Sequence, residues 1–158
     1  MASRRTEKGR GARRAAKRKR DPFAPFRVSR PTQIVTKSDQ LFKDVEFLYK
    51  QKRFALVLYL GGFVVECLLK AALWKRRHER GVRELLFGHD LARLLAASPV
   101  LSRDMERDRL GAYNYFYFVR VSSWHVGIRY NPKQVAPEDA DAFLTQLREV
   151  RRWLRNRI

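Results

Sequence analysis

The chain has 158 residues, of which 35 are Lys or Arg and 16 are Asp or Glu, giving a formal net charge of +19. This excess favours a polyanionic partner, first nucleic acid and less often an anionic membrane, and disfavours an adaptor unrelated to nucleic acid. At this length, and with 45% hydrophobic residues, one domain with one packed core is expected.

The cysteine and histidine content limits the disulfides and metal sites that the chain can form. The single cysteine, Cys67, excludes an internal disulfide and fits a reducing compartment, so a cytoplasmic location is expected. Three histidines without a His/Cys cluster predict no structural zinc, and no cofactor is expected. We also expect no membrane association, because no apolar stretch is expected to reach the roughly 18 residues that span a bilayer.

Residues 1–33 are predicted to form a disordered basic tail. The first thirty residues hold 12 Lys and Arg against only Glu7 and Asp21. Two interpretations stay open: a solvated segment that aids solubility, or an electrostatic arm that contacts the nucleic-acid backbone. The candidate contacts of such an arm are Arg13, Arg14, Lys17, Arg18, Lys19 and Arg20.

Residues 34–158 are predicted to form one all-α domain of four to five helices. A first helix is expected from about Thr36, with Thr36 or Ser38 as its cap. A second is expected from Arg53 to Arg77, with Gly61 and Gly62 in its middle. Two glycines inside a helix cost about 1 kcal/mol each relative to alanine, so a neighbouring helix should approach closely there. The expected inner face of this helix is Phe54, Leu58, Val65, Leu69 and Ala72.

Three further helices are expected in the second half of the chain. One runs from His89 to about Ala97, where Pro99 ends it. The next runs from about Ser102 to about Ile128, with a break near Gly111. The last begins at Pro137, because a proline followed by two acids is typical of a first helical turn. Its predicted inner stripe is Phe143, Leu147, Val150 and Leu154.

Arg120 and His125 lie five residues apart near the end of the predicted fourth helix. On a helix they would lie about 140° apart around the axis, close enough for long side chains to converge on one phosphate. A fixed cation and a group that titrates near neutral pH are what metal-free RNA cleavage needs.

Three segments in order resemble the HEPN domain family. Residues 59–71 (YLGGFVVECLLKA) resemble that family's small-residue helix with a glutamate followed by LKA. Residues 88–95 (GHDLARLL) are similar to its HDL helix start, and Arg129-Tyr130 are similar to the RY pair before its final helix. The resemblance covers residues 40–158 and implies an up-and-down helical bundle that commonly forms homodimers.

The resemblance also implies a function. Many HEPN proteins are metal-independent ribonucleases of toxin–antitoxin, CRISPR or antiviral defence systems, and active members carry Arg-x(4–6)-His in a late helix. Arg120 and His125 match that motif by position, whereas Arg83 and His89 match only its spacing. The sequence departs from the family at Val121, where a polar residue often follows the arginine.

Several other residues are candidates for supporting roles. Glu66 lies in an apolar segment and needs a cation, for which Lys70 is the local candidate and Arg129 the distant one. His89 is expected to act mainly in capping a helix. Further candidate nucleic-acid contacts, which are alternatively a solvated face and cations at helix ends, are Arg76, Arg77, Arg148, Arg151, Arg152 and Arg155.

Two functions therefore stay open. One is a HEPN-type endoribonuclease that needs a second histidine from a homodimer partner. The other is a catalytically inactive HEPN subunit that binds RNA, DNA or a protein within a larger defence or ribonucleoprotein assembly, with a nucleotidyltransferase-type protein as one possible partner.

Overall fold

The computed structural model describes residues 28–117 and 124–158. Within these ranges the chain is helical and has no strand, which confirms the all-α expectation. The α-helices are α1 Pro31–Lys50, α2 Phe54–Leu73, α3 Arg80–Phe87, α4 Leu91–Ala96, α5 Pro99–Arg107, α6 Arg109–Phe116 and α7 Pro137–Arg155. In the same described ranges, 3₁₀ turns are found at η1 Trp74–Arg76 and η3 Val126–Tyr130.

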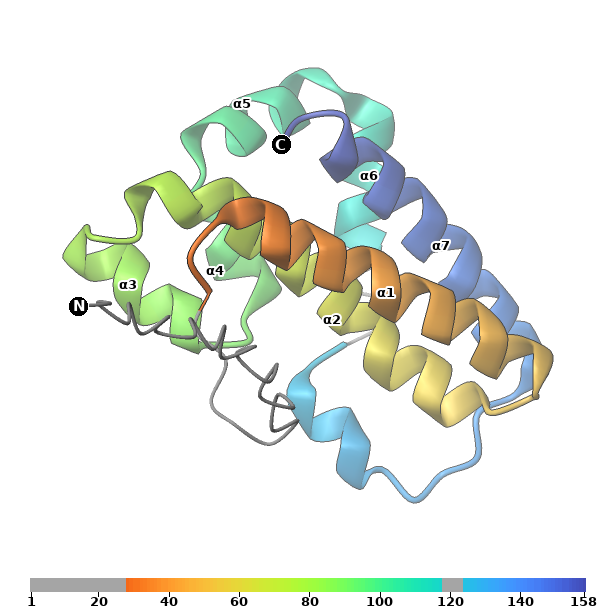
Figure 1. Cartoon of the computed structure of the whole chain (residues 1–158). Helices are drawn as coiled ribbons and strands as arrows, with labels where there is room; N and C mark the ends of the chain where they lie inside the picture. Colours follow the sequence, from red (N-terminus) through yellow and green to blue (C-terminus); the bar gives the residue numbers. More distant parts are fainter. Residues whose placement is uncertain (1–27, 118–123) are drawn as a thin grey trace, which may run out of the picture.

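Helix α2 is the centre of the fold. It packs against both α1 and α7, and the three long helices lie alongside one another in Figure 1. The shorter helices α3 to α6 gather at one end of this group, and η3 packs against α2 elsewhere along its length. Burial on several sides explains why α2 carries few charges. Its fully buried side chains include Val57, Val64, Val65, Leu68, Leu69 and Leu73.

Helix α1 begins earlier than the sequence pattern predicts. Pro31 occupies its first turn, and the side chain of Gln33 accepts a hydrogen bond of 3.1 Å from the backbone N–H of Arg30. Neither Thr36 nor Ser38 is therefore a cap, and the expected domain boundary after residue 33 falls inside α1. Ser38 is buried instead, and its hydroxyl donates to the carbonyl of Val64 at 2.9 Å, which links α1 to α2.

The middle of the chain is divided differently from the prediction. Helix α3 was not expected, and Pro99 begins α5 instead of only ending the helix before it. The break between α5 and α6 falls at Asp108, which caps α6 through the backbone N–H of Gly111, and not at Gly111 itself. The predicted fourth helix does not continue to Ile128, because residue 125 has extended backbone angles.

The prediction for the last helix is confirmed. Helix α7 begins at Pro137, and Glu138 and Asp139 lie in its first turn. The whole predicted stripe from Phe143 to Leu154 is buried, and Val65 and Leu69 of the predicted face of α2 are fully buried. Phe54, Leu58 and Ala72 are only half-buried.

The two glycines of α2 make room for aromatic side chains. A Cβ atom at Gly61 would overlap the ring of Phe143 from α7, and one at Gly62 would overlap the indole of Trp124. The predicted close approach is therefore confirmed at Gly61, where the partner is a side chain of a neighbouring helix. At Gly62 the partner comes from the segment before η3.

The stretch Phe54–Arg76, which is α2 with η1, is long and apolar enough to cross a membrane by length and composition. The expectation that no stretch reaches that length is therefore wrong. The reason is that a central helix of a bundle needs apolar residues on most of its circumference, and 56% of its most apolar window is buried. Core helices of soluble proteins pass the same test, so this length assigns no membrane role.

Candidate functional site

The predicted catalytic pair is described only in part. Arg120 lies outside the described residues, and His125 is exposed. The backbone of His125 is extended (φ −151°, ψ 158°) and it directly precedes η3. The helical geometry assumed for the pair therefore does not apply to its histidine.

The backbone beside His125 is anchored by Trp124. This indole is 5% exposed, lies over Gly62, and donates from Nε1 to the carbonyl of Tyr59 at 3.3 Å. On the other side, a Cβ atom at Gly127 would come within 2.8 Å of Nδ1 of His125. The backbone of His125 thus follows a buried tryptophan, and its imidazole lies at the surface beside Gly127.

A second histidine is held by a buried carboxylate. Glu66 of α2 is 5% exposed, and its Oε2 lies 2.9 Å from Nδ1 of His89. Its other oxygen, Oε1, accepts from Nζ of Lys70 at 2.8 Å. The local partner predicted for Glu66 is therefore confirmed, and the distant one is wrong, because the carboxylate is shared by Lys70 and His89 and not by Arg129.

His89 does not cap α4. Asp90 does so, since its carboxylate accepts a hydrogen bond of 3.0 Å from the backbone N–H of Arg93. The sequence pattern does not predict the contact between His89 and Glu66, which are 23 residues apart. A glutamate inside an apolar helix is the sequence feature that could have indicated this contact. If both oxygens of such a glutamate are buried, it requires more than one hydrogen-bond partner.

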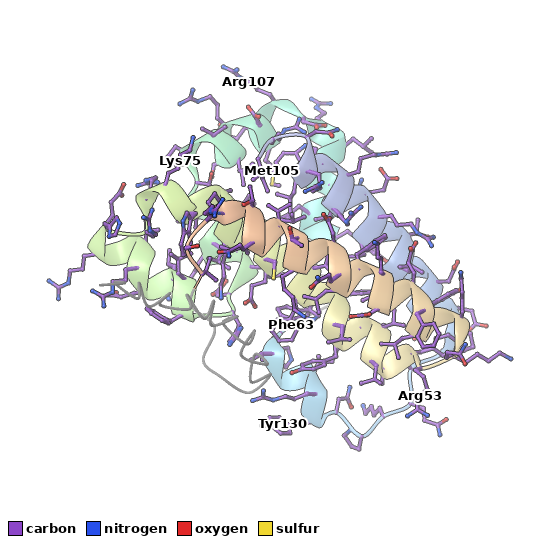
Figure 2. All side chains as sticks on the ribbon, viewed as in Figure 1. Arg53, Phe63, Lys75, Met105, Arg107 and Tyr130 are labelled. Atoms are coloured by element: carbon purple, nitrogen blue, oxygen red, sulfur yellow. The ribbon has the colours of Figure 1, made fainter. Side chains whose placement is uncertain are left out.

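One aromatic cluster connects the two histidine-bearing segments. The ring of Phe63 meets that of His89 edge-on, with centroids 5.8 Å apart, and that of Trp124 at 5.5 Å. Tyr59, one turn earlier on α2, meets Phe63 at 5.2 Å. Figure 2 shows Phe63 beside η3. The cluster defined by Tyr59, Phe63, His89 and Trp124 is called the aromatic cluster below.

Arg129 and Tyr130, expected to support the site, lie at the end of η3. The guanidinium of Arg129 lies 4.7 Å from the centre of the Tyr130 ring, and hydrogen bonding to Tyr59 raises the pKa of Arg129. Tyr130 is 75% exposed and lies at the outer edge of η3 in Figure 2. Arg129 thus binds the aromatic cluster at Tyr59 and not the carboxylate of Glu66.

The arginines of α7 are engaged in ion pairs. Arg151 binds Asp39 at 2.8 Å and Arg148 binds Glu46 at 3.2 Å, which joins α7 to α1. Arg155 also approaches Asp39, at 3.7 Å, and Arg152 pairs with Glu149 on its own helix. These contacts give the stripe a structural role that neither interpretation from the sequence contained.

The two arginines after α2 are also partnered. Arg76 donates to Glu79 and to the carbonyl of Ala97, and Arg77 donates to the carbonyl of Trp74 while lying 5.0 Å from its ring. The six basic residues predicted as an arm, Arg13 to Arg20, lie outside the described residues.

Among the described residues, no group of three or more His, Cys, Asp or Glu side chains is placed to hold a metal ion. In comparisons with known proteins, the chain matches no family model, no curated protein and no solved structure.

Proposed function

We propose that this protein is a HEPN-type protein that acts on nucleic acid, as a metal-independent endoribonuclease. The observation that carries the proposal is the anchoring of exposed His125 by buried Trp124. A surface histidine whose backbone is tied to the core can hold a proton-transfer group in a defined place while leaving it open to a large substrate.

The high positive charge supports a nucleic acid as the substrate. Outside the first thirty residues the chain still holds 23 Lys and Arg against 14 Asp and Glu, so the body is basic even after its internal ion pairs are formed. Contacts between Lys or Arg side chains and phosphates provide affinity for nucleic acid without recognising its base sequence. They would bring a phosphodiester to His125 by electrostatic attraction.

The proposed reaction is attack of a ribose 2′-oxygen on the adjacent phosphorus. The bond to the 5′-oxygen breaks, leaving a 2′,3′-cyclic phosphate and a 5′-hydroxyl. Arg120 would bind the phosphate oxygens and stabilise their charge, and His125 would transfer one of the two protons that move. The second proton needs a second group, which a homodimer could supply as the His125 of its other chain.

The test is cleavage of end-labelled RNA in EDTA by wild type, His125→Ala and Arg120→Ala. His78→Ala is the matched control, because His78 is exposed in the turn before α3, outside the segment that carries Arg120 and His125. We expect the control to cleave like wild type and the two site variants to lose at least about 100-fold in rate. Equal cleavage by all four proteins would overturn the catalytic proposal.

A second function, a non-catalytic subunit of a larger assembly, is favoured by one observation. Helix α6 exposes Leu110 (65%) and Tyr113 (61%), and Tyr113 stacks on Tyr117 with ring centroids 6.3 Å apart. Exposed apolar side chains of this size suit a partner surface. RNA binding without cleavage, together with weaker assembly of Leu110→Lys, would favour this function over the first.

A further inference from the structure

The pair formed by Glu66 and His89 has the geometry of an oriented general base. The Glu66 carboxylate is almost fully buried, whereas 43% of the His89 side chain is exposed. A carboxylate can only accept a hydrogen bond, so neutral His89 must carry its proton on Nδ1. The other ring nitrogen, Nε2, is then unprotonated and able to accept a proton.

The positive charge of Lys70 balances the negative charge of Glu66. Its ammonium group is 2.8 Å from Oε1 of Glu66 and only 16% exposed, so the buried carboxylate already has a cationic partner. His89 therefore does not have to be protonated to neutralise Glu66. Among the described residues, Glu66 bonds to the imidazole, Lys70 bonds to Glu66, and Asp90, the next residue in the chain, uses its carboxylate to cap α4.

We propose that His89, oriented by Glu66, is a second catalytic histidine of this protein and acts as the base in RNA cleavage. The inference rests on the proposed function. It replaces the need for a second His125 from a partner chain with a residue of the same chain.

The position of His89 supports this assignment. Phe63 contacts the rings of both His89 and Trp124, and Trp124 directly precedes His125 in the chain. Phe63 of α2 therefore lies between His89 and the residue that precedes His125, and both histidines are open to solvent. An RNA strand that crosses the aromatic cluster would pass His89 and the segment that carries His125.

The proton balance of the step is complete. Nε2 of His89 takes the proton of the 2′-hydroxyl as its oxygen bonds to phosphorus. The bond between phosphorus and the 5′-oxygen breaks, and protonated His125 gives its proton to that leaving oxygen. Proton exchange with water then restores both histidines, so no further reactant is needed.

The experiment compares two substitutions of His89 that differ in which ring nitrogen they imitate. His89→Asn places an amide N–H near the position of Nδ1, so it can keep the hydrogen bond to Glu66 but has no base. His89→Gln reaches toward the position of Nε2 and loses that bond. We expect His89→Asn to melt near the wild-type temperature yet to lose at least about 100-fold in kcat/KM.

The pH dependence of kcat/KM tests the role of His89 directly, because a residue with a purely structural role would not change the shape of this profile. In the wild type, the acidic limb of the kcat/KM profile reports protonation of the base. We expect His89→Asn to lose this limb and His78→Ala to keep it. Glu66→Gln, which can hold either tautomer of His89, should retain the limb at a lower rate.

The outcomes separate this inference from the function on which it rests. If His125→Ala is inactive but folded His89→Asn cleaves like wild type with both pH limbs, the proposed function stands and the base assignment is overturned. If wild type does not cleave RNA at all, both are overturned. Loss of activity with loss of the acidic limb in His89→Asn supports both.

Discussion

The indole of Trp124 fills the space that a side chain at Gly62 would need, because a Cβ atom at residue 62 would overlap the ring. The same ring is hydrogen-bonded to Tyr59, one turn away on α2. This relationship ties the segment that carries His125 to the central helix. The position of the candidate site therefore depends on the absence of a side chain at residue 62.

Gly62→Ala should displace Trp124 and destabilise the protein. Overpacking of this kind costs typically about 1–3 kcal/mol in the free energy of unfolding, against about 1 kcal/mol gained from the better helix propensity of alanine. Urea unfolding followed by circular dichroism measures the difference. Gly81→Ala in α3 is the matched control, because a Cβ atom there meets nothing within 4 Å, and it should be neutral or stabilising. Equal stability of the two variants would contradict the packing described.

Ser38→Ala should remove the hydrogen bond that links α1 to α2. The hydroxyl is fully buried and donates to the carbonyl of Val64, so its loss should lower the free energy of unfolding by about 1 kcal/mol. Thr36→Ala is the control, since its exposed hydroxyl bonds only to Thr32 on the same helix. Chemical denaturation of both variants measures their free energies of unfolding. A larger decrease for Thr36→Ala than for Ser38→Ala would contradict the role given to Ser38.

Asp108 should make stability depend on pH. The backbone N–H of Gly111 lowers the pKa of this carboxyl most, and the indole of Trp153 and the guanidinium of Arg157 lower it further. A carboxyl whose pKa is lower in the folded state stabilises the fold above its unfolded pKa and loses that effect as pH falls through its folded pKa.

The melting temperature of Asp108→Asn should therefore lie below that of wild type at pH 7, and the gap should narrow below about pH 4. Thermal melts between neutral and acidic pH measure it. Glu106→Gln, on the exposed surface of α5, should show a smaller gap at pH 7. A gap for Asp108→Asn that stays constant down to low pH would show that the carboxylate charge is not the cause.

Cys67 should react slowly with thiol reagents in the folded protein. Burial, and then the negative charge of Glu66, raises its pKa to about 11 from the ordinary 9.0. At pH 8 the reactive thiolate is then about 100-fold scarcer than for an ordinary thiol. Because the chain has one cysteine, the rate with a chromogenic disulfide reports this residue alone. The same protein in urea is the control, and equal rates in both states would contradict the prediction.

RNA binding should depend strongly on salt through the basic arm. If the six residues Arg13 to Arg20 named above contact six phosphates, log K should fall with log salt with a slope of roughly −4 to −5. Replacing all six by Gln should remove most of this slope. Replacing Arg148 and Arg151, which already bind Glu46 and Asp39, should change the slope much less. Filter binding at several salt concentrations distinguishes the two sets, and a reversed order would assign the RNA surface to α7.

The sequence predicts the elements whose signals are local. Helix α7 is marked by Pro137 and two acids, and its apolar period matches its buried face. The pairing of Glu66 with Lys70 also follows from helical spacing. In contrast, α3 is short, lacks a side-chain cap and ends with an exposed Phe87, so only the helical spacing of Val82, Leu85 and Leu86 marks it. Pro99 is ambiguous by nature, because proline is suited both to ending one helix and to opening the next.

The parts of the site that the sequence does not predict depend on distant contacts. Whether His89 caps a helix or binds a carboxylate is decided by where α4 lies against α2, and the neighbouring Asp90 can cap equally well. The sequence predicts His125 within a helix that runs to about Ile128. Its extended backbone instead follows from the docking of Trp124 into the space at Gly62, a partner that no local pattern indicates.

Three glycines of this fold each face an aromatic ring from a distant segment: Gly61 faces Phe143, Gly62 faces Trp124 and Gly111 faces Trp153. A larger residue at one position is tolerated only if its ring partner becomes smaller at the same time. Neutral drift at these sites should therefore proceed by compensating pairs, so that in related sequences the loss of the glycine and the loss of the ring would occur together.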